Sequence, residues 1–258
     1  MKKILSIRGL SFSYKKDRPV LNNVDLEIEE GTVTGILGRN GCGKSTLFNT
    51  IIGYHDNFTG EILINGDPIL SLTPSEFSRR AAYVPQSSNI NIDFTVFEYI
   101  LFGRNCHMRF GSSPSENDWQ LVYRYADQCG ITGLLKKNIN SVSGGERQLA
   151  CIARALVQES PLILMDEPAS ALDFGNHAKL LRMIKALQES GKTIIFTTHD
   201  PNDVTDLDCN AAIVSDGRIL LHGRAGEIIT FDLLTRIYGE EIELFRNRMY
   251  GSVNNNLQ

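Results

Sequence analysis

The 258-residue sequence lacks the cysteine pattern of a disulfide-bonded or zinc-binding protein. Its five cysteines are scattered along the chain, and none belongs to a C-x-x-C pair. This spacing fits neither a disulfide framework nor a zinc site. Free thiols in a reducing compartment are the simpler interpretation.

Long hydrophobic runs are absent as well. Uninterrupted apolar stretches such as Leu162–Met165 fall far short of the ~20 residues that a membrane-spanning helix needs. No long apolar segment follows Met1, Lys2 and Lys3, so no signal peptide is expected. Any contact with a membrane is therefore expected to go through a partner protein.

Neither sign of charge dominates the sequence. The formal net charge is −4, and acidic and basic residues are spread along the chain. A general nucleic-acid-binding protein would carry a basic patch or a high isoelectric point, so nucleic acid is not an expected partner. Hydrophobic residues make up 42% of the chain and charged residues 22%, which is ordinary globular usage.

The periodicity of the chain predicts an α/β fold that begins with an antiparallel part. The first ~70 residues alternate apolar and polar positions between Asn-Gly and Glu-Gly turns, which is typical of an antiparallel sheet. Within them, the apolar strand Val33–Leu37 runs into a glycine-rich loop and a helix at Lys44–Ile52. Residues 87–158 lack strand signals and are predicted to be helical, most clearly at Trp119–Gly130.

Strand signals return in the last third of the chain, where they alternate with helices. This alternation implies a mostly parallel sheet with helices on both faces, and the helical stretch is then a lobe inserted between two strands. A tail at 251–258 is expected to be frayed. The predicted strands are Leu162–Asp166, Thr193–Thr198 and Ala211–Ser215, and the predicted helices are Asn176–Glu189, which stops at Gly191, and Glu227–Tyr238.

The segment from Gly38 to Ser45 matches the phosphate-loop pattern G-x-x-x-x-G-K-S/T. It stands between a predicted strand and a predicted helix, the context that this loop requires. Its glycines let backbone N–H groups turn inward around an anion, and the helix N-terminus adds its positive end. Lys44 is expected to reach the β- and γ-phosphates, and the Ser45 hydroxyl is expected to ligate Mg²⁺. The alternative is that the segment matches the phosphate-loop pattern by chance. The expected nucleotide-binding residues here are Gly38, Asn40, Gly41, Cys42, Gly43, Lys44, Ser45 and Thr46.

One position of this loop, Cys42, carries a thiol. Lys44 and the positive end of the helix both stabilise a thiolate over a thiol, which predicts a reactive cysteine. Whether or not the thiol is activated, alkylation of a reachable Cys42 is expected to block ATP hydrolysis, because it adds bulk where the phosphates bind. The alternative is that Cys42 is only a small residue tolerated in a tight loop.

Two carboxylates, Asp166 and Glu167, follow the apolar run Leu162–Met165. They emerge at the carboxyl end of a predicted buried strand, where α/β sheets place their ligands. Asp166 is expected to hold magnesium through water, and Glu167 to be the general base that polarises the attacking water. The alternative is that the two acids only cap the end of a strand.

A second glycine-rich helix start, Val142–Glu146, lies between the phosphate loop and the two acids. Ser143 is expected to be the N-cap of the following helix, and such a helix start can bind a γ-phosphate. The segment resembles the L-S-G-G-Q signature of the ABC ATPases, from which it departs at Val142 and Glu146. Standing alone, such a segment is more often an ordinary capped helix.

Other residues match the same family in the same order, and the resemblance covers residues 3–240. It implies that Gln86 senses Mg²⁺ and the attacking water, and that His199 holds the γ-phosphate and orients that water near Glu167. The matching residues are Tyr14 for the aromatic that stacks on adenine, Gln86 for the Q-loop, Asp173 for the D-loop and His199 for the switch histidine.

The resemblance implies a single ABC ATPase domain over residues 1–250. Its fold is a P-loop NTPase core, RecA-like, at about 1–86 and 159–240, with a mostly parallel sheet, an N-terminal antiparallel β subdomain and an inserted helical lobe at about 87–158. In the family two ATP molecules are held between two subunits arranged head to tail, so a second copy of the chain is an expected partner. The expected contacts to the partner's nucleotide are Ser143, Gly144, Gly145, Glu146 and Asp173, and the expected magnesium ligands are Ser45, Gln86 and Asp166.

Several short segments resemble the corresponding segments of ATP-binding subunits of importers for iron–siderophore, haem, cobalamin or molybdate-type substrates. They include Phe94–Val96, Phe102–Arg104, Leu172–Asn176 and His199–Asn202. The resemblance implies ATP and Mg²⁺ as cofactors, an integral membrane permease as partner and, indirectly, a periplasmic or extracellular solute-binding protein. It places the chain peripherally on the cytoplasmic face of the membrane and does not choose the solute.

Three other functions fit the sequence less well than this one. An exporter more often has its ATPase fused to membrane helices, and a soluble ABC protein of DNA repair or translation needs a long coiled coil or two ATPase domains. A non-hydrolysing nucleotide switch is disfavoured by the presence of Glu167 and His199.

Overall fold

The centre of the molecule is a six-stranded sheet in which five neighbouring strands are parallel. The computed structural model describes residues 2–15, 18–86, 92–109 and 111–239. The strand order is β10-β9-β3-β8-β7-β6, and the edge strand β10 runs antiparallel to β9. The strands are β3 Val33–Leu37, β6 Ala81–Val84, β7 Leu162–Met165, β8 Thr193–Thr198, β9 Asn210–Ser215 and β10 Arg218–Arg224.

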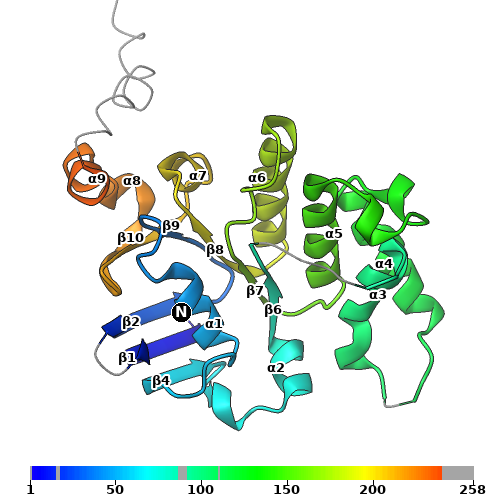
Figure 1. The fold of residues 1–258 in the computed structure, drawn as a ribbon, viewed down its shortest axis with the longest axis horizontal. Helices are drawn as coiled ribbons and strands as arrows, with labels where there is room; N and C mark the ends of the chain where they lie inside the picture. Colours follow the sequence, from blue (N-terminus) through cyan, green and yellow to red (C-terminus); the bar gives the residue numbers. More distant parts are fainter. Residues whose placement is uncertain (1, 16–17, 87–91, 110, 240–258) are drawn as a thin grey trace, which may run out of the picture.

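A second sheet, antiparallel throughout, is built from the first part of the chain, as the alternating pattern predicts. Its order is β2-β1-β4-β5, with β1 paired to both β2 and β4. Figure 1 shows this sheet beside α1 (Lys44–Ile51), the helix that follows the glycine-rich loop. The strands are β1 Lys3–Lys15, β2 Arg18–Glu29, β4 Thr59–Ile64 and β5 Asp67–Pro68.

The predicted helical lobe lies in the chain between β6 and β7, which are neighbours in the parallel sheet. Figure 1 shows its helices gathered on one side of the molecule, and residues 87–91 and 110 of this stretch lie outside the described residues. Its helices are α3 Val96–Leu101, η2 Phe102–His107, α4 Glu116–Gln128, η3 Thr132–Leu134, η4 Ile139–Ser141 and α5 Gly144–Leu156. The remaining helices are η1 Ile69–Ser71, α2 Pro74–Arg80, α6 Phe174–Glu189, α7 Pro201–Asp206, α8 Ala225–Ile228 and α9 Phe231–Tyr238.

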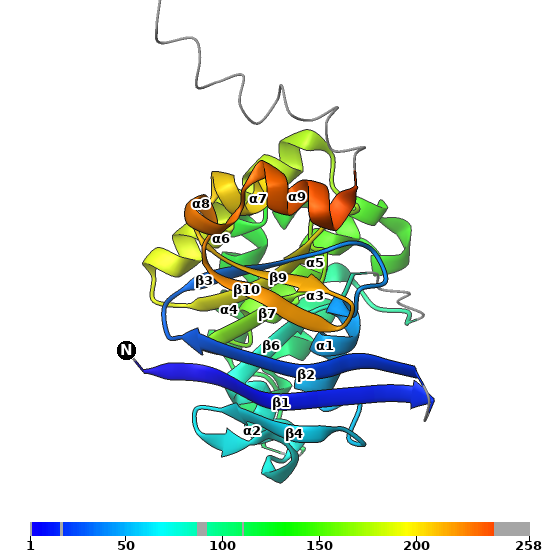
Figure 2. The same cartoon turned by 90° about the vertical axis from the view of Figure 1, so that its left-hand side faces the viewer.

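The parallel sheet separates two hydrophobic cores, because its central strands are buried on both faces. In β7, Leu162 and Leu164 belong to the core that also contains α1 and the antiparallel sheet. Ile163 and Met165 belong to the opposite core, together with apolar residues of α5, α6 and α9. Figure 2 shows α6, α7 and α9 on the opposite side of the parallel sheet from β1 and β2. The sheet is thereby packed on both faces, and the loops at its strand ends are anchored to this packed sheet.

The C-terminal helix differs from the prediction. The pattern predicts one helix at Glu227–Tyr238, but the structure has two, separated at Ile229 and Thr230. The Thr230 side chain accepts a hydrogen bond from the Leu233 N–H and so starts α9 as a new helix. The predicted tail at 251–258 lies outside the described residues. Within the described ranges, none of the helices has the length and apolar character needed to cross a membrane.

Candidate active site

The predicted site residues lie at one edge of the parallel sheet. Because β3, β8, β7 and β6 are parallel neighbours, the segments that follow them leave at the same edge. The glycine-rich loop follows β3, Gln86 follows β6, Asp166 and Glu167 follow β7, and His199 follows β8. Residues that are far apart in the sequence therefore meet in one place.

The phosphate loop depends on backbone positions that favour glycine. Gly41 and Gly43 have φ angles of 81° and 110°, and Gly43 is the N-cap of α1. A Cβ atom at Gly38 would lie 2.4 Å from the Val214 carbonyl oxygen, so no larger residue fits there. The Lys44 side chain is only 5% exposed, and its Nζ donates to the Gly38 carbonyl oxygen at 2.7 Å. The ammonium group is therefore held against the loop that is predicted to bind phosphates.

The two acids are both held by a threonine of β8. Thr197 Oγ1 donates to Asp166 Oδ1 at 2.6 Å and accepts from the Glu167 N–H at 2.7 Å. Asp166 is buried beside the Tyr83 phenol, whose pKa is raised by burial and by the nearby carboxylate. Thr197 and Tyr83 are not among the residues predicted from the sequence. Tyr83 lies three positions before Gln86, and Thr197 lies two positions before His199. Their closeness to predicted site residues is the only sequence feature that points to them.

Glu167 is the residue on which the other site residues converge. Its backbone has a φ of 42°, in the left-handed region that non-glycine residues seldom adopt. Gln86 Nε2 donates to Glu167 Oε2 at 2.9 Å, and Lys44 Nζ lies 3.7 Å from Oε1. His199 Nδ1 lies 3.7 Å from Oε2, too far for a hydrogen bond. The structure thus brings the other two predicted catalytic residues, Gln86 and His199, and the loop lysine around the Glu167 carboxylate.

The Val142–Glu146 segment starts α5 as a capping box. Ser143 Oγ accepts from the Glu146 N–H at 3.3 Å, and the Glu146 carboxylate accepts from the Ser143 N–H at 2.8 Å. The hydrogen bond from the Ser143 backbone N–H has the largest effect on the pKa of Glu146, which it lowers. Hydrogen bonding to the Ser143 side chain lowers it further. A Cβ at Gly145 would lie 3.1 Å from the Ala171 carbonyl oxygen, so the segment adjoins the turn before α6. Among the residues that the structure describes, no hydrogen bond or ion pair joins it to the phosphate loop.

A family model described as ABC transporter matches residues 21–170, a range that contains the phosphate loop, the signature segment and the two acids. The chain belongs to the ABC transporter family. It is an ATPase of the ABC type, and both the family and the fold class predicted from the sequence are confirmed.

Curated relatives of this ABC ATPase match it over nearly its whole length. The molybdate import ATP-binding protein MolC of Haemophilus influenzae is 33% identical, over 92% of this chain and 89% of its own length. The manganese transport system ATP-binding protein MntA of Synechocystis sp. is 32% identical, over 96% of this chain and 95% of its own length.

Solved structures of ABC proteins have the same fold. One is a transporter described as of the metal-chelate type, in an inward-facing conformation, with 31% identity and a TM-score of 0.79 over 92% of this chain and 89% of the other. Another is the dimeric ATP-binding cassette MJ0796 in a post-hydrolysis state bound to ADP and Pi. It has 26% identity and a TM-score of 0.76 over 86% of this chain and 98% of its own.

Tyr14 of this ABC ATPase lies beside the first turn of α1. Its side chain is exposed at 60%, and its hydroxyl lies 3.3 Å from Thr46 Oγ1 and 3.3 Å from His55 Nε2. The Phe12 ring stacks on His55 at 4.4 Å and meets Tyr14 edge-on at 5.0 Å. An exposed aromatic face is thus fixed next to the phosphate loop, and no sequence motif pointed to His55 as its neighbour.

The Cys42 thiol differs from the prediction. Lys44 does lower its pKa, as expected, but burial has the larger effect, and the pKa is raised. The expectation of a stabilised thiolate is therefore wrong. Cys42 is half-buried, whereas the other four cysteines of the chain are buried.

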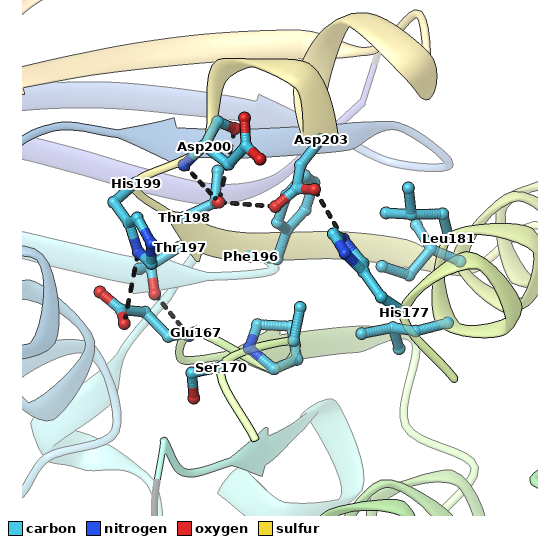
Figure 3. A pocket seen from close by; sticks show the side chains of 14 residues that line it. Glu167, Ser170, His177, Leu181, Phe196, Thr197, Thr198, His199, Asp200 and Asp203 are labelled. Carbon is cyan, nitrogen blue, oxygen red and sulfur yellow. Dashed lines mark hydrogen bonds and ion pairs between the residues drawn. The ribbon is translucent and has the colours of Figure 1, made fainter. Parts of the chain in front are cut away.

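A cavity of about 280 Å³ lies behind Glu167 and His199 in this ABC ATPase (Figure 3). It is bounded by α6 on one side and by the segment from β8 to α7 on the other. His177 Nε2 lies 2.7 Å from Asp203 Oδ1, and both residues line this space. From α9, the Tyr238 hydroxyl donates to the His199 carbonyl oxygen at 3.2 Å. His177, Asp203 and Tyr238 belong to no sequence motif and were not predicted as site residues.

Proposed function

We propose that this chain hydrolyses ATP as one subunit of a dimeric importer ATPase and so powers solute uptake through a separate membrane permease. The observation that carries the hydrolytic part is the meeting of Gln86, Lys44 and His199 around the Glu167 carboxylate. A carboxylate held beside a phosphate loop can take a proton from the water that attacks the γ-phosphate. Glu167 is thus the proposed general base, and Gln86 and His199 orient the water and the γ-phosphate.

The proposed nucleotide site combines the phosphate loop with Tyr14. Backbone N–H groups from Gly38 to Thr46 and the Lys44 ammonium would bind the phosphates, since they present donors and positive charge at a helix N-terminus. The exposed Tyr14 ring beside α1 is suited to stack on adenine.

Magnesium fits the donors at this edge of the sheet. The Ser45 hydroxyl, the Gln86 amide oxygen and the Asp166 carboxylate are hard oxygen ligands, which Mg²⁺ prefers. Ser45 is exposed, and Asp166 is held in place by Thr197. When bound, the metal would neutralise negative charge that develops on the phosphates.

Dimerisation would complete each site with a signature segment from the second copy. Ser143, Gly144, Gly145, Glu146 and Asp173 are the proposed contacts to the partner's nucleotide. Their support is that the capping hydrogen bonds join Ser143 to Glu146 of the same helix start and that Ser143 and Gly144 are exposed, so the segment presents a helix N-terminus at the surface. The dimeric cassette MJ0796 bound to ADP and Pi has the same fold. Each copy is proposed to be a single ABC ATPase domain, with its core at 1–86 and 159–240 and its lobe at 87–158.

Import through a separate permease is supported by the relatives. MolC and MntA are named as ATP-binding proteins of molybdate import and of manganese transport, and the metal-chelate type transporter has the same fold. We propose a metal chelate (iron–siderophore, haem or cobalamin) or molybdate as the solute, delivered by a solute-binding protein, and a peripheral place on the cytoplasmic face of the membrane. An exporter or a soluble ABC protein is the alternative.

The decisive experiment purifies the chain with its permease in lipid and measures ATP turnover with candidate loaded solute-binding proteins. We expect one loaded binding protein to stimulate turnover and the same protein without solute to stimulate it less. Turnover that no binding protein changes, with solute carried outward, would favour the exporter. Failure to retain any membrane protein during purification would favour the soluble alternative.

A further inference from the structure

A row of hydrogen bonds joins α6 to the backbone on both sides of His199 (Figure 3). His177 Nε2 lies 2.7 Å from Asp203 Oδ1, and Thr198 Oγ1 donates to Asp203 Oδ2 at 2.6 Å. Thr198 Oγ1 also accepts from the Asp200 N–H at 3.0 Å. Because Thr198 and Asp200 are the direct chain neighbours of His199, these bonds fix the backbone that carries the switch histidine.

The middle member of the row, Asp203, is a buried carboxylate. It is 5% exposed, and burial raises its pKa while Thr198 and His177 oppose that effect. Each carboxylate oxygen has one of these two side chains as its partner. A buried carboxylate that loses a partner is strongly disfavoured. Removal of the His177 imidazole is therefore expected to make Asp203 rearrange, and Thr198 with it.

The far end of the row lies at the Asp173 turn. Asp173 caps α6 through its side chain, and the His177 N–H donates to the Asp173 carbonyl oxygen at 2.8 Å. His177 thus belongs to the first turn of the helix that begins at a proposed contact to the partner subunit.

The His199 ring depends on its backbone for its position. Its side chain is 57% exposed, and its Nδ1 lies beyond hydrogen-bond distance of Glu167. The cavity beside His177 means that apolar packing does not fill the space between α6 and the His199 segment. The polar bridge through Asp203 is therefore a direct contact between them beside this cavity.

We propose that His177 is a positioning residue that holds His199 for ATP hydrolysis, acting from the first turn of α6 through Asp203 and Thr198. The inference rests on the proposed role of His199 and adds to it a physical link between the Asp173 turn and the switch histidine. His177 itself does not touch the reacting atoms.

The kinetic test compares two substitutions in the full chain. His177→Leu removes the side-chain donor, and His177→Gln keeps one. We expect His177→Leu to lower kcat about tenfold with little change in KM for ATP, as for loss of a hydrogen bond to a charged group, and His177→Gln to recover most of the loss. Lys185→Leu makes a similar change on the exposed side of α6 and should leave kcat unchanged.

Repeating the substitution in a His199→Ala chain separates the two proposals. Because His177 acts through His199, adding His177→Leu to the His199→Ala chain should lower kcat very little further. A similar tenfold loss there, or an unchanged kcat in the single His177→Leu variant, would overturn the positioning role and leave the proposed function standing. Full activity of His199→Ala alone would instead contradict the role of His199 and the positioning proposal together.

Hydrogen exchange at the Asp200 N–H gives a readout that does not depend on turnover. Its bond to Thr198 Oγ1 should open more often in His177→Leu, so exchange should be faster there than in wild type, His177→Gln or Lys185→Leu. Equal exchange at Asp200 in all four folded proteins would overturn the proposal.

Discussion

At the scale of single residues, the position of Glu167 is fixed at two points. Its backbone N–H is bound by Thr197, and its carboxylate is bound by Gln86. A general base removes a proton only when it lies within hydrogen-bond reach of the water that it activates. The neighbours that aim this carboxylate therefore matter as much as the carboxylate itself.

Glu167→Gln should keep ATP binding and lower turnover about 10²–10⁴-fold, because the amide has the same shape but cannot act as a base. Since hydrolysis separates the proposed dimer, this variant should accumulate as an ATP-bound dimer. Phosphate release measures the first effect and size-exclusion chromatography with ATP the second. Near-normal turnover would show that Glu167 is not the base.

Cys42 gives a second prediction at this scale, and the sign of its pKa shift sets the pH dependence. Burial raises the pKa of the thiol, so the reactive thiolate is scarce at neutral pH and increases as the pH rises toward the raised pKa. A maleimide should therefore inactivate the enzyme slowly at neutral pH and faster at alkaline pH, and Mg-ATP should protect it. Cys42→Ser should stay active and resist the reagent. Equal inactivation of both proteins would place the sensitive thiol elsewhere.

At the scale of secondary-structure elements, α4 and α5 provide a matched pair. Both are 13 residues long, and each begins with a serine capping box, at Ser115 and Ser143 respectively. The caps satisfy backbone N–H groups that a helix leaves free at its start. Only the second cap belongs to the segment that is proposed to contact the partner's nucleotide.

Ser115→Ala and Ser143→Ala should each lower the free energy of unfolding by about 1 kcal/mol, the usual cost of a lost N-cap. Only Ser143→Ala should also lower ATP turnover, because only it removes a proposed phosphate contact. Urea unfolding and phosphate release measure the two effects on the same preparations. Equal losses of turnover would mean that Ser143 acts only through the stability of its helix.

At the scale of the whole molecule, the two halves of the proposed site lie on different surfaces of one chain. The phosphate loop and Glu167 meet at the edge of the parallel sheet, while the signature segment starts a helix of the lobe. The proposed shared site requires two chains, so lesions in its two halves are expected to complement each other.

Lys44→Ala and Ser143→Arg chains should each be inactive alone. A mixed dimer should contain one site with both lesions and one with neither, so it should bind one nucleotide. Tagging the two chains differently isolates the mixed dimer, and bound nucleotide is then counted per dimer. Undiminished nucleotide binding by a Ser143→Arg homodimer, which keeps Lys44 in both chains, would exclude the shared site.

The features that depend on neighbouring residues can be read from the sequence alone. The alternation of β1 and β2, the apolar run of β7 with Asp166 and Glu167 behind it, and the phosphate loop between β3 and α1 are local patterns. Local patterns can be predicted because strand periodicity and turn geometry act over a few positions. The order of motifs then identified the family before any contact was known.

Which distant side chains meet, and how deeply they are buried, depends on the packing of the whole fold. Thr197 is hydrogen-bonded to both Asp166 and Glu167, and His177 is hydrogen-bonded to Asp203 beside a cavity. Neither contact follows from spacing in the sequence. For Cys42, the charge of Lys44 could be anticipated from two positions away, but the burial that outweighs it could not. Desolvation and long-range hydrogen bonds depend on all the elements packed around a group, and they exist only after the chain has folded.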